Sequence, residues 1–247
     1  MHWRKLTGFA LVVLALNGTA LGAERATLAD AAERRDAALM RTLLKGGGDV
    51  NGTQVDGTTA LHWAAYYDDA DAVALLLKSG ANVNATNRYG VPPLSLACSN
   101  GSGAVVKLLL AAGADANASV KGGETALMMA ARSGNLDAVK ALLVHGAKPE
   151  ARERRGQSPL MWAAAEGHAA VVRALIEAGA DVNARLDSGF TPFFFAVREG
   201  NIEAVRAFLD AGVDVNATLQ RRERSAAPGD NASYSRPVGR GTSPLML

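Results

Sequence analysis

Glycine recurs every 33 residues through most of this 247-residue chain. The repeated glycines form two series, the first at Gly57, Gly90, Gly123, Gly156 and Gly189 and the second at Gly47, Gly80, Gly113, Gly146, Gly179 and Gly212. A fixed period of roughly 20–50 residues is typical of stacked repeats, because one unit is too small to bury its apolar face without a neighbour. The spacing therefore predicts an array of like units in which most residues serve the scaffold.

Each period contains the same succession of motifs. It opens with Gly-x-Thr-Ala/Pro-Leu-x-x-Ala, as in Gly57–Ala64 and Gly189–Ala196, and closes with Gly-Ala-Asp-x-Asn-Ala, as in 179–184. The Thr hydroxyl before Ala or Pro is suited to cap a helix. Between the two motifs, Val-x-x-Leu-Leu gives a second helix one apolar stripe. The pattern predicts two short helices in every period.

These motifs resemble those of ankyrin repeats over about residues 26–219. The resemblance implies an all-α repeat fold, an α-solenoid of helix-turn-helix units joined by β-hairpin-like loops. An N-terminal capping repeat is expected at 24–54, because its apolar residues keep the register although no full hairpin precedes them. Five full repeats are expected across 55–219, at 55–87, 88–120, 121–153, 154–186 and 187–219.

A few positions depart from the pattern. The first helices are expected to end at left-handed glycines, namely Gly101, Gly134, Gly167 and Gly200. Asp68 takes that place in the first full repeat, where a short polar side chain tolerates the same conformation. Pro92 replaces the capping Thr, so that helix is expected to lack a side-chain cap. Residues 148–150, Lys-Pro-Glu, replace Asp-x-Asn, and an altered turn is expected there.

The N-terminal residues 1–23 read separately from the repeats. Arg4 and Lys5 precede the apolar run Leu6–Leu16, and small residues follow up to Ala23. The run is shorter than the roughly 20 residues that span a bilayer, so 1–23 is predicted to be a signal peptide. An uncleaved anchor and an intracellular protein that keeps these residues are the alternatives. The Ala-, Gly- and Arg-rich composition indicates a bacterial source. Together with the predicted signal peptide, it leads us to expect an exported protein, periplasmic or secreted. The mature chain is expected to have no membrane span.

The repeat pattern lapses after the fifth full repeat. Residues 220–240 are rich in Arg, Ser and Ala, which predicts a basic, flexible insertion. Residues 241–247 (GTSPLML) match the opening of a sixth repeat that the sequence leaves unfinished. We therefore expect the chain to be a fragment, the alternative being a natural end in which this stub acts as a poor cap.

Charge and residue types exclude several classes of function. Removing 1–23 lowers the Lys and Arg count from 26 to 24, equal to the 24 Asp and Glu, so no nucleic-acid partner is expected. The register favours a structural role for His62 over a ligand, and a buried core position for Cys98 over a nucleophile. Trp63 and Trp162 are equivalent, which favours packing over a ligand cage. We expect no enzyme, no cofactor and no metal.

What remains for function is the surface. The resemblance to ankyrin repeats implies that a partner binds the concave face formed by the hairpin tips and the first helices. The variable positions of that face, mapped through the register, are Tyr66, Tyr67, Arg88, Tyr89, Asn100, Arg132, Arg154, Arg155, Gln157, Phe190 and Arg198. Tyr and Arg are residue types that supply interface hot spots. A monomer that binds an unknown protein partner is expected, the alternative being the recognition arm of a longer enzyme or toxin with its catalytic part beyond Leu247.

The signal-peptide prediction is tested by the mass of the mature protein. Expression of the full chain in a bacterium with a periplasm should yield a protein that begins after Ala23 and is found outside the cytoplasm. Intact mass spectrometry of each fraction measures this. Recovery of the exported protein with Met1 still in place would contradict cleavage.

Overall fold

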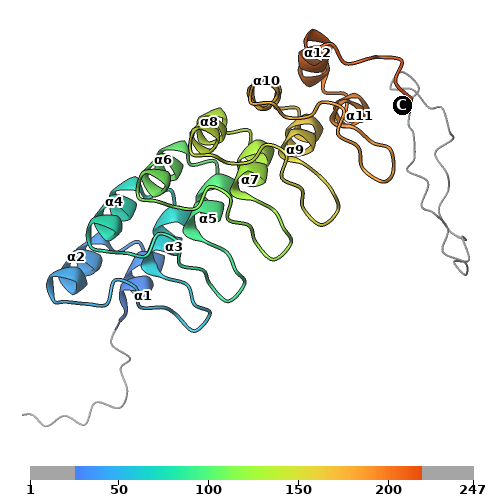
Figure 1. Cartoon of the computed structure of the whole chain (residues 1–247). Coiled ribbons are helices and arrows are strands. Elements are labelled where there is room, and N and C mark those ends of the chain that lie inside the picture. Colours follow the sequence, from blue (N-terminus) through green and yellow to red (C-terminus); the bar gives the residue numbers. More distant parts are fainter. Residues whose placement is uncertain (1–25, 219–247) are drawn as a thin grey trace, which may run out of the picture.

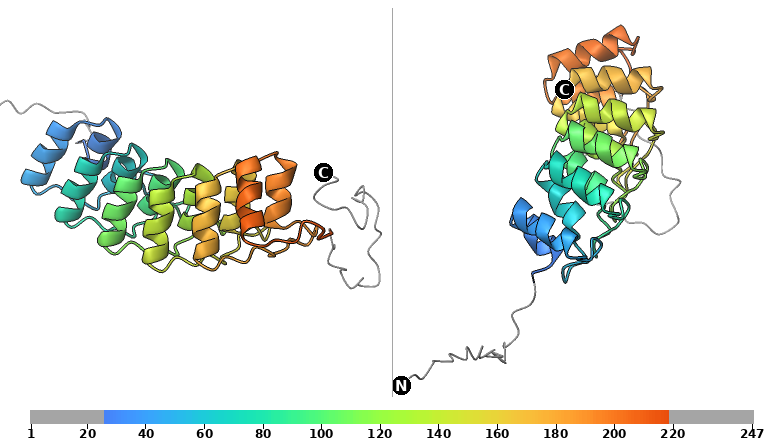
Figure 2. Two further views of the ribbon diagram at one scale, coloured as in Figure 1. Left: turned by 90° about the horizontal axis from the view of Figure 1, so that it is seen from above. Right: turned by 90° about the vertical axis from the view of Figure 1, so that its left-hand side faces the viewer.

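The computed structural model describes residues 26–218, which form twelve α-helices in six consecutive pairs (Figure 1). The first helices of the pairs are α1 (Leu28–Glu33), α3 (Ala60–Tyr66), α5 (Pro93–Ser99), α7 (Ala126–Ser133), α9 (Pro159–Glu166) and α11 (Pro192–Arg198). The second helices are α2 (Ala37–Lys45), α4 (Ala70–Lys78), α6 (Gly103–Ala111), α8 (Leu136–Val144), α10 (Ala169–Glu177) and α12 (Ile202–Asp210). The pairs stack in sequence order into an elongated array (Figure 2), which confirms the all-α repeat fold. The predicted signal peptide (1–23), basic insertion (220–240) and sixth-repeat opening (241–247) lie outside the described residues.

The predicted caps begin the first helices. Thr59, Thr125, Ser158 and Thr191 each accept a hydrogen bond from the backbone N–H three residues later. Pro92 makes no such bond, as its side chain predicts. A proline follows at the first helical position in α5, α9 and α11, where the missing N–H has no partner within the helix.

A left-handed residue then reverses the chain between the two helices of each pair. Gly134 has a φ angle of 73°, and the equivalent glycines of the other units also have positive φ angles. Asp68 takes the same conformation with φ 55°, which confirms the sequence prediction. Arg35, at the equivalent place in the capping unit, has φ 56°. The position therefore keeps its geometry even where glycine is absent, because the helices on either side fix it.

Small and branched apolar side chains fill the space between units. Every first helix contributes an alanine to one buried column, namely Ala31, Ala64, Ala97, Ala130, Ala163 and Ala196. Leu61, Leu94, Leu127 and Leu160 form a second buried column beside it. The second helices bury Leu76, Leu109, Leu142 and Leu175 at equivalent positions. These columns make one continuous core along the stack, as the repeat period predicts.

Asparagines of the closing turns join successive units. Asn84 Nδ2 donates to Gly113 O at 3.0 Å, and Asn84 Oδ1 accepts from Asp115 N at 2.9 Å. Asn117 makes the same pair of bonds to Gly146 O (2.9 Å) and Lys148 N (3.0 Å). Glu150 is next in this series and only accepts, from Asp181 N at 2.6 Å. A carboxylate has no amide with which to donate to the following unit.

The turn at 148–150 is altered in its side-chain bond and unchanged in its backbone bond. Ala151 N donates to Lys148 O at 3.2 Å, as Ala85 N donates to Asn82 O at 3.2 Å in an unaltered turn. In that unaltered turn Asn82 Oδ1 also accepts from Asn84 N at 3.0 Å, and the Lys148 side chain cannot make this bond because it has no acceptor. The Lys-Pro-Glu sequence also changes the link to the next unit.

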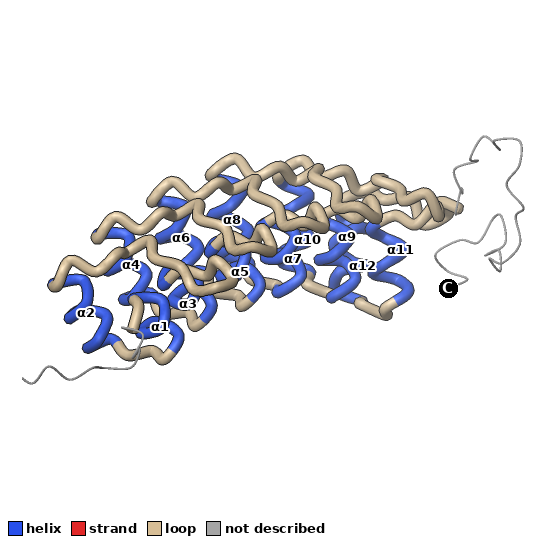
Figure 3. Tube along the Cα trace, turned by 90° about the horizontal axis from the view of Figure 1, so that it is seen from below, coloured by secondary structure: helices blue, strands red, loops and turns tan. Residues whose placement is uncertain are grey.

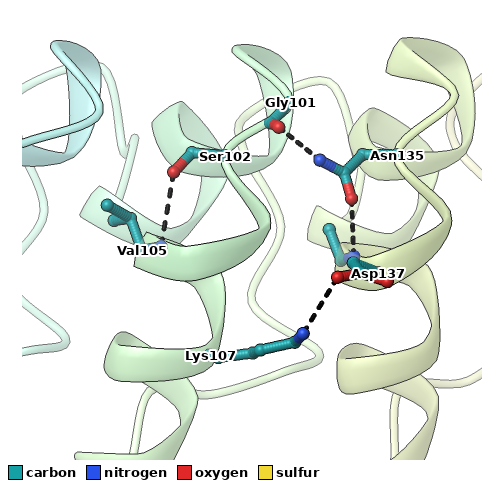
Figure 4. Close-up of polar contacts among 7 residues, drawn as sticks. Gly101, Ser102, Val105, Lys107, Asn135 and Asp137 are labelled. Carbon is teal, nitrogen blue, oxygen red and sulfur yellow. Dashed lines mark hydrogen bonds and ion pairs between the residues drawn. The ribbon is translucent and has the colours of Figure 1, made fainter. Parts of the chain in front are cut away.

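The residues that precede the second helices make further links between units. Asn135 accepts from Ala138 N at 2.8 Å, which caps α8, and donates from Nδ2 to the carbonyl of Gly101 in the preceding unit (Figure 4). Lys107 of α6 meets Asp137 of α8 at 3.0 Å nearby. Asn201 also reaches back to the preceding unit, with Nδ2 2.9 Å from Ala165 O, but its side chain does not cap α12. Asn135 therefore both caps its own helix and bonds the preceding unit.

The loops between units project from the row of first helices and lie side by side (Figures 1 and 3). We call them the hairpin loops, residues 53–58, 86–91, 119–124, 152–157 and 185–190. Each is closed by a backbone bond, such as Val120 N to Glu124 O at 3.0 Å, and within 26–218 they contain bridges but no extended strand. The surface formed by the hairpin loops and the first helices is named the hairpin face, and it corresponds to the concave face expected from the sequence.

The asparagine links predict a measurable loss of stability. Asn117→Ala removes two hydrogen bonds between units, and we expect the free energy of unfolding to fall by about 1–3 kcal/mol. Glu150→Asn supplies the missing donor and should raise it by about 0.5–1.5 kcal/mol. Urea denaturation followed by circular dichroism measures both. Lys140→Ala, on the exposed side of α8, is the control, and an equal loss there would contradict the assignment.

Candidate functional site

The residues predicted from sequence all lie on the hairpin face. Tyr66, Tyr67, Asn100, Arg132 and Arg198 stand in or just after the last turn of first helices. Arg88, Tyr89, Arg154, Arg155, Gln157 and Phe190 stand in hairpin loops. The structure shows that they fall into distinct local environments, and only some of them are free to meet a partner.

An aromatic cluster occupies the N-terminal end of the face. The rings of Trp63, Tyr66 and Tyr67 lie with their centroids 5.1–6.0 Å apart. The Arg35 guanidinium lies 5.4 Å from the centroid of Tyr67. Trp63 Nε1 donates to Gln54 Oε1 at 2.9 Å, so its polar atom is satisfied. Tyr66 is 47 % exposed, and the cluster therefore presents a rigid aromatic surface.

Cationic side chains extend along the tips of the middle hairpin loops. Arg88 donates to Tyr89 Oη at 2.9 Å and lies 5.0 Å from the centroid of that ring. Tyr89 is 52 % exposed. Arg154 N donates to Gly122 O at 3.2 Å, which joins one tip to the preceding one. The side chains of Arg154 and Arg155 are exposed and have no partner among residues 26–218.

Three of the predicted residues make contacts that hold neighbouring parts of the repeat array in place. Asn100 donates its side-chain N–H to the carbonyl of Tyr66 and so holds the end of α3. Gln157 is half-buried, and its backbone closes the hairpin loop, donating to Glu153 Oε1 at 3.0 Å and accepting from Glu153 N at 3.1 Å. Phe190 is half-buried against Phe194, with centroids 5.8 Å apart. These residues hold their neighbours in position. The repeat register alone does not distinguish such a residue from one whose side chain is available to a partner.

At the C-terminal end of the face, one arginine covers two aromatic rings. The Arg198 guanidinium lies 5.1 Å from the Phe195 centroid and 5.5 Å from the Phe190 centroid. Its Nη2 also meets Glu199 Oε1 at 2.6 Å. Arg198 is therefore held in place by ring faces and a carboxylate, and it remains an exposed cation.

A pocket of about 570 Å³ opens at the centre of the face. Its lining comes from α5, α7, α9 and one hairpin loop, and consists of Ser99, Val120, Glu124, Met128, Met129, Arg132, Ser133, Trp162 and Glu166. Arg132 spans it, 5.1 Å from the Trp162 ring centroid and 3.8 Å from Glu166 Oε1. Of this lining, the sequence prediction included Arg132 alone.

Trp162 differs from its equivalent Trp63 in one respect that matters for binding. Trp162 Nε1 is buried and has no hydrogen-bond partner, whereas Trp63 Nε1 bonds Gln54. The residue equivalent to Gln54 is Glu153, and its carboxylate accepts instead from the backbone N–H groups of Arg155 and Gln157. The equivalence of the tryptophans was visible in the sequence, but the loss of the acceptor was not.

His62 and Cys98 have the structural roles predicted for them. His62 Nδ1 accepts from Thr59 N at 3.2 Å, and Nε2 lies 2.9 Å from Val91 O, so the neutral Nε2–H tautomer satisfies both partners. Burial lowers the pKa of His62 below its usual 6.5, against the opposing effects of the Val91 bond and Asp56. Burial raises the pKa of the Cys98 thiol to about 12, which keeps it protonated and unreactive near neutral pH.

The described residues contain neither a metal-binding cluster nor a membrane-spanning helix. Within residues 26–218, no cluster of three or more His, Cys, Asp or Glu side chains is arranged to hold a metal ion. None of the helices in that range is long and apolar enough to cross a membrane.

Comparison with known proteins identifies the family. The family model for ankyrin repeats, which spans three copies of the repeat, matches the chain at residues 28–120, 94–186 and 127–218. These matches cover most of the chain, which therefore belongs to the ankyrin-repeat family. Ankyrin repeats are generally protein-binding modules without catalytic activity. None of the curated proteins compared with the chain matches it.

The environment of His62 predicts a dependence of stability on pH. Below pH 6.5 His62 is protonated in the unfolded chain. In the folded chain it stays neutral to a lower pH, because its pKa is lowered by burial. The free energy of unfolding should therefore fall as the pH drops from 7.5 to 5, and fall less in His62→Gln. Hydrogen bonds from Gln54 and Thr58 hold the pKa values of Asp30 and Asp56 below 3.8, outside this range.

Urea titrations at several pH values measure this slope. His145→Gln is the matched control, because His145 is exposed at the end of α8. Equal slopes in the wild type and His62→Gln would overturn the assignment.

Proposed function

We propose that this chain is a non-enzymatic interaction module that binds a protein partner on its hairpin face. The partner contacts the first helices and the hairpin loops, and binding depends on surface complementarity. The residues proposed to meet it directly are Tyr66, Tyr67, Arg88, Tyr89, Arg132, Arg154, Arg155 and Arg198. Asn100, Gln157 and Phe190 hold these side chains in position.

The observation that supports this proposal is the placement of the contacts between arginine and aromatic rings. Within residues 26–218, each such contact lies on the hairpin face, from Arg35–Tyr67 at one end to Arg198–Phe195 at the other. An arginine resting on a ring is already ordered, so less side-chain entropy is lost when a partner binds. Arg, Tyr and Trp are also the residues that most often dominate binding energy at protein interfaces. The second helices have no comparable group.

Export of the module is a separate part of the proposal. Its support is the sequence of residues 1–23, a short basic start followed by an apolar run and small residues. A stack with a buried, unpaired cysteine and no need for disulfides is stable in an oxidising or a reducing compartment. We propose a bacterial protein that acts as a monomer in the periplasm or outside the cell.

Substitution of the aromatic cluster tests the binding face. Tyr66→Ala/Tyr67→Ala should weaken partner binding at least tenfold, because it removes exposed aromatic area and the ring that orders Arg35. The measurement is capture of a cross-linked partner from an extract of the source organism, quantified by mass spectrometry. Lys78→Ala/Lys140→Ala, on exposed positions of second helices, is the control.

Circular dichroism must show that both variants keep the wild-type helix content. Unchanged capture by every hairpin-face variant, or a loss confined to the second-helix control, would remove the hairpin face from the function.

A further inference from the structure

We propose that the Trp162 pocket and the cations beside it bind an acidic, extended segment of the partner, with one apolar side chain of that segment inside the pocket. This inference rests on the proposed function and adds the chemistry of the partner. It joins two features of the hairpin face, the pocket between α5, α7 and α9 and the charged tips of three hairpin loops. We call these tips the basic crest, defined by Arg88, Lys121, Arg152, Arg154 and Arg155.

The basic crest is built by the repeat period itself. Arg88, Lys121 and Arg154 occupy equivalent positions in successive hairpin loops, one unit apart. All five side chains of the crest are exposed. The loops are bonded to one another, for example by Lys121 Nζ to Arg88 O at 3.0 Å. The crest is therefore a fixed row of cations along the rim of the face.

These cations form no ion pair within residues 26–218. Arg88 donates to a phenol, Lys121 to a carbonyl, and Arg152 to the carbonyls of Gly156 and Arg185. No ion pair with a carboxylate of residues 26–218 involves any of the five crest side chains. The row therefore keeps a positive charge that a partner can neutralise.

Two carboxylates of the hairpin loops are hydrogen-bonded within their own loops. Glu153 is buried and accepts from the backbone N–H groups of its own loop, at 2.9 Å and 3.0 Å. Asp56 accepts from Thr58 N and Thr58 Oγ1 at 2.9 Å and 2.8 Å. Both acidic groups stabilise hairpin loops. Asp56 also interacts electrostatically with Arg88 at one end of the crest, whereas no carboxylate among residues 26–218 forms an ion pair with Arg154 or Arg155.

The pocket supplies an apolar anchor point beside this charge. Met128, Met129, Val120 and the Trp162 ring give it apolar walls, and its volume of about 570 Å³ accommodates a Phe, Leu or Met side chain with adjoining backbone. Val120 lies in the same hairpin loop as Lys121, so pocket and crest are contiguous. The polar groups of the lining are Arg132, Glu124 and Glu166, and Arg132 faces Glu166.

An extended backbone also satisfies the unpaired indole of Trp162. The Nε1–H is buried and has no acceptor, yet the ring is half-buried and lines the pocket. In the proposed complex the Trp162 ring turns so that this N–H donates to a carbonyl of the bound segment. Glu124, which has no ion-pair partner among the described residues, is placed to accept a backbone N–H of the same segment. A peptide has both groups, whereas a nucleic acid brings phosphates to the two carboxylates of the pocket.

Selection from a random library tests the chemistry of the partner. The purified full chain is used to select from a display library of random 12-residue peptides, and the enriched peptides are synthesised for affinity measurement by fluorescence polarisation. We expect enrichment of Asp and Glu around one Phe, Leu, Trp or Met. Affinity should fall with salt, because the crest is exposed. Enrichment of Lys- and Arg-rich peptides, or of none, would overturn the proposal.

Two matched pairs of variants locate the site. Arg154→Glu/Arg155→Glu should weaken binding at least tenfold, whereas Lys140→Glu/Arg173→Glu makes the same change of net charge on second helices and should not. Ser99→Tyr places in the pocket the residue that Tyr66 provides one unit earlier, so the fold tolerates it while the pocket is filled. It should abolish binding, and Ala74→Tyr, exposed on α4, should not. Trp162→Phe should cost about 2- to 10-fold by removing the N–H.

The outcomes separate this inference from the function on which it rests. Loss of cellular partner capture in Tyr66→Ala/Tyr67→Ala, with no effect of Ser99→Tyr or of the crest variant on any ligand, would leave protein binding intact and overturn the acidic segment. A fluorescein-labelled single-stranded 20-mer DNA that binds more tightly than the acidic peptides, and depends on the same crest residues, would overturn it in favour of a nucleic acid.

Discussion

The structure depends on the close approach of successive first helices. One alanine from each unit lies in a buried column at the line of contact, where its small side chain lets neighbouring first helices lie close together. A larger side chain there would separate neighbouring units and open the leucine columns on both sides. Each unit is stable only because its neighbours cover it, and the free energy of the fold is shared among like interfaces. The spacing of everything else, including the hairpin loops, follows from this contact.

That constraint explains the structural roles of Cys98 and His62. Cys98 stands in the register of Ala65 and Ala131, where it is fully buried and burial suppresses the thiolate. His62 is enclosed between its own helix cap and the carbonyl of Val91 in the next hairpin loop. His62 therefore links two units, and Cys98 fills the core. The loop tips and the exposed turns of the first helices are the parts of each unit that are not buried against a neighbouring unit. Binding is proposed at these parts.

The candidate site arises where equivalent positions hold different residues. Trp63 and Trp162 are in the same register, but one indole finds Gln54 and the other finds no acceptor, because Glu153 is turned into its own loop. Position 66 holds a tyrosine that stacks in an aromatic cluster, and the serine at position 99 leaves a pocket in its place. Identical backbones thus present an aromatic surface at one end and a hollow with basic tips at the centre. The proposed binding specificity therefore depends on the few side chains that differ between equivalent positions of the repeat.

The sequence by itself determined the fold and its local geometry. The glycine period gave the units, the Thr and Ser before Ala or Pro gave the caps, and Asp68 was correctly assigned a left-handed conformation. These features are local, because a cap or a reversal depends on residues a few positions apart. Tertiary structure alone decided that the Asn100 side chain bonds the end of α3, that Glu150 makes only one bond to the next unit, and that Trp162 lines a pocket without a hydrogen-bond partner. Each of these depends on which atom of a neighbouring unit comes within about 3 Å, and a repeat pattern fixes the neighbour but not the direction in which its side chain points.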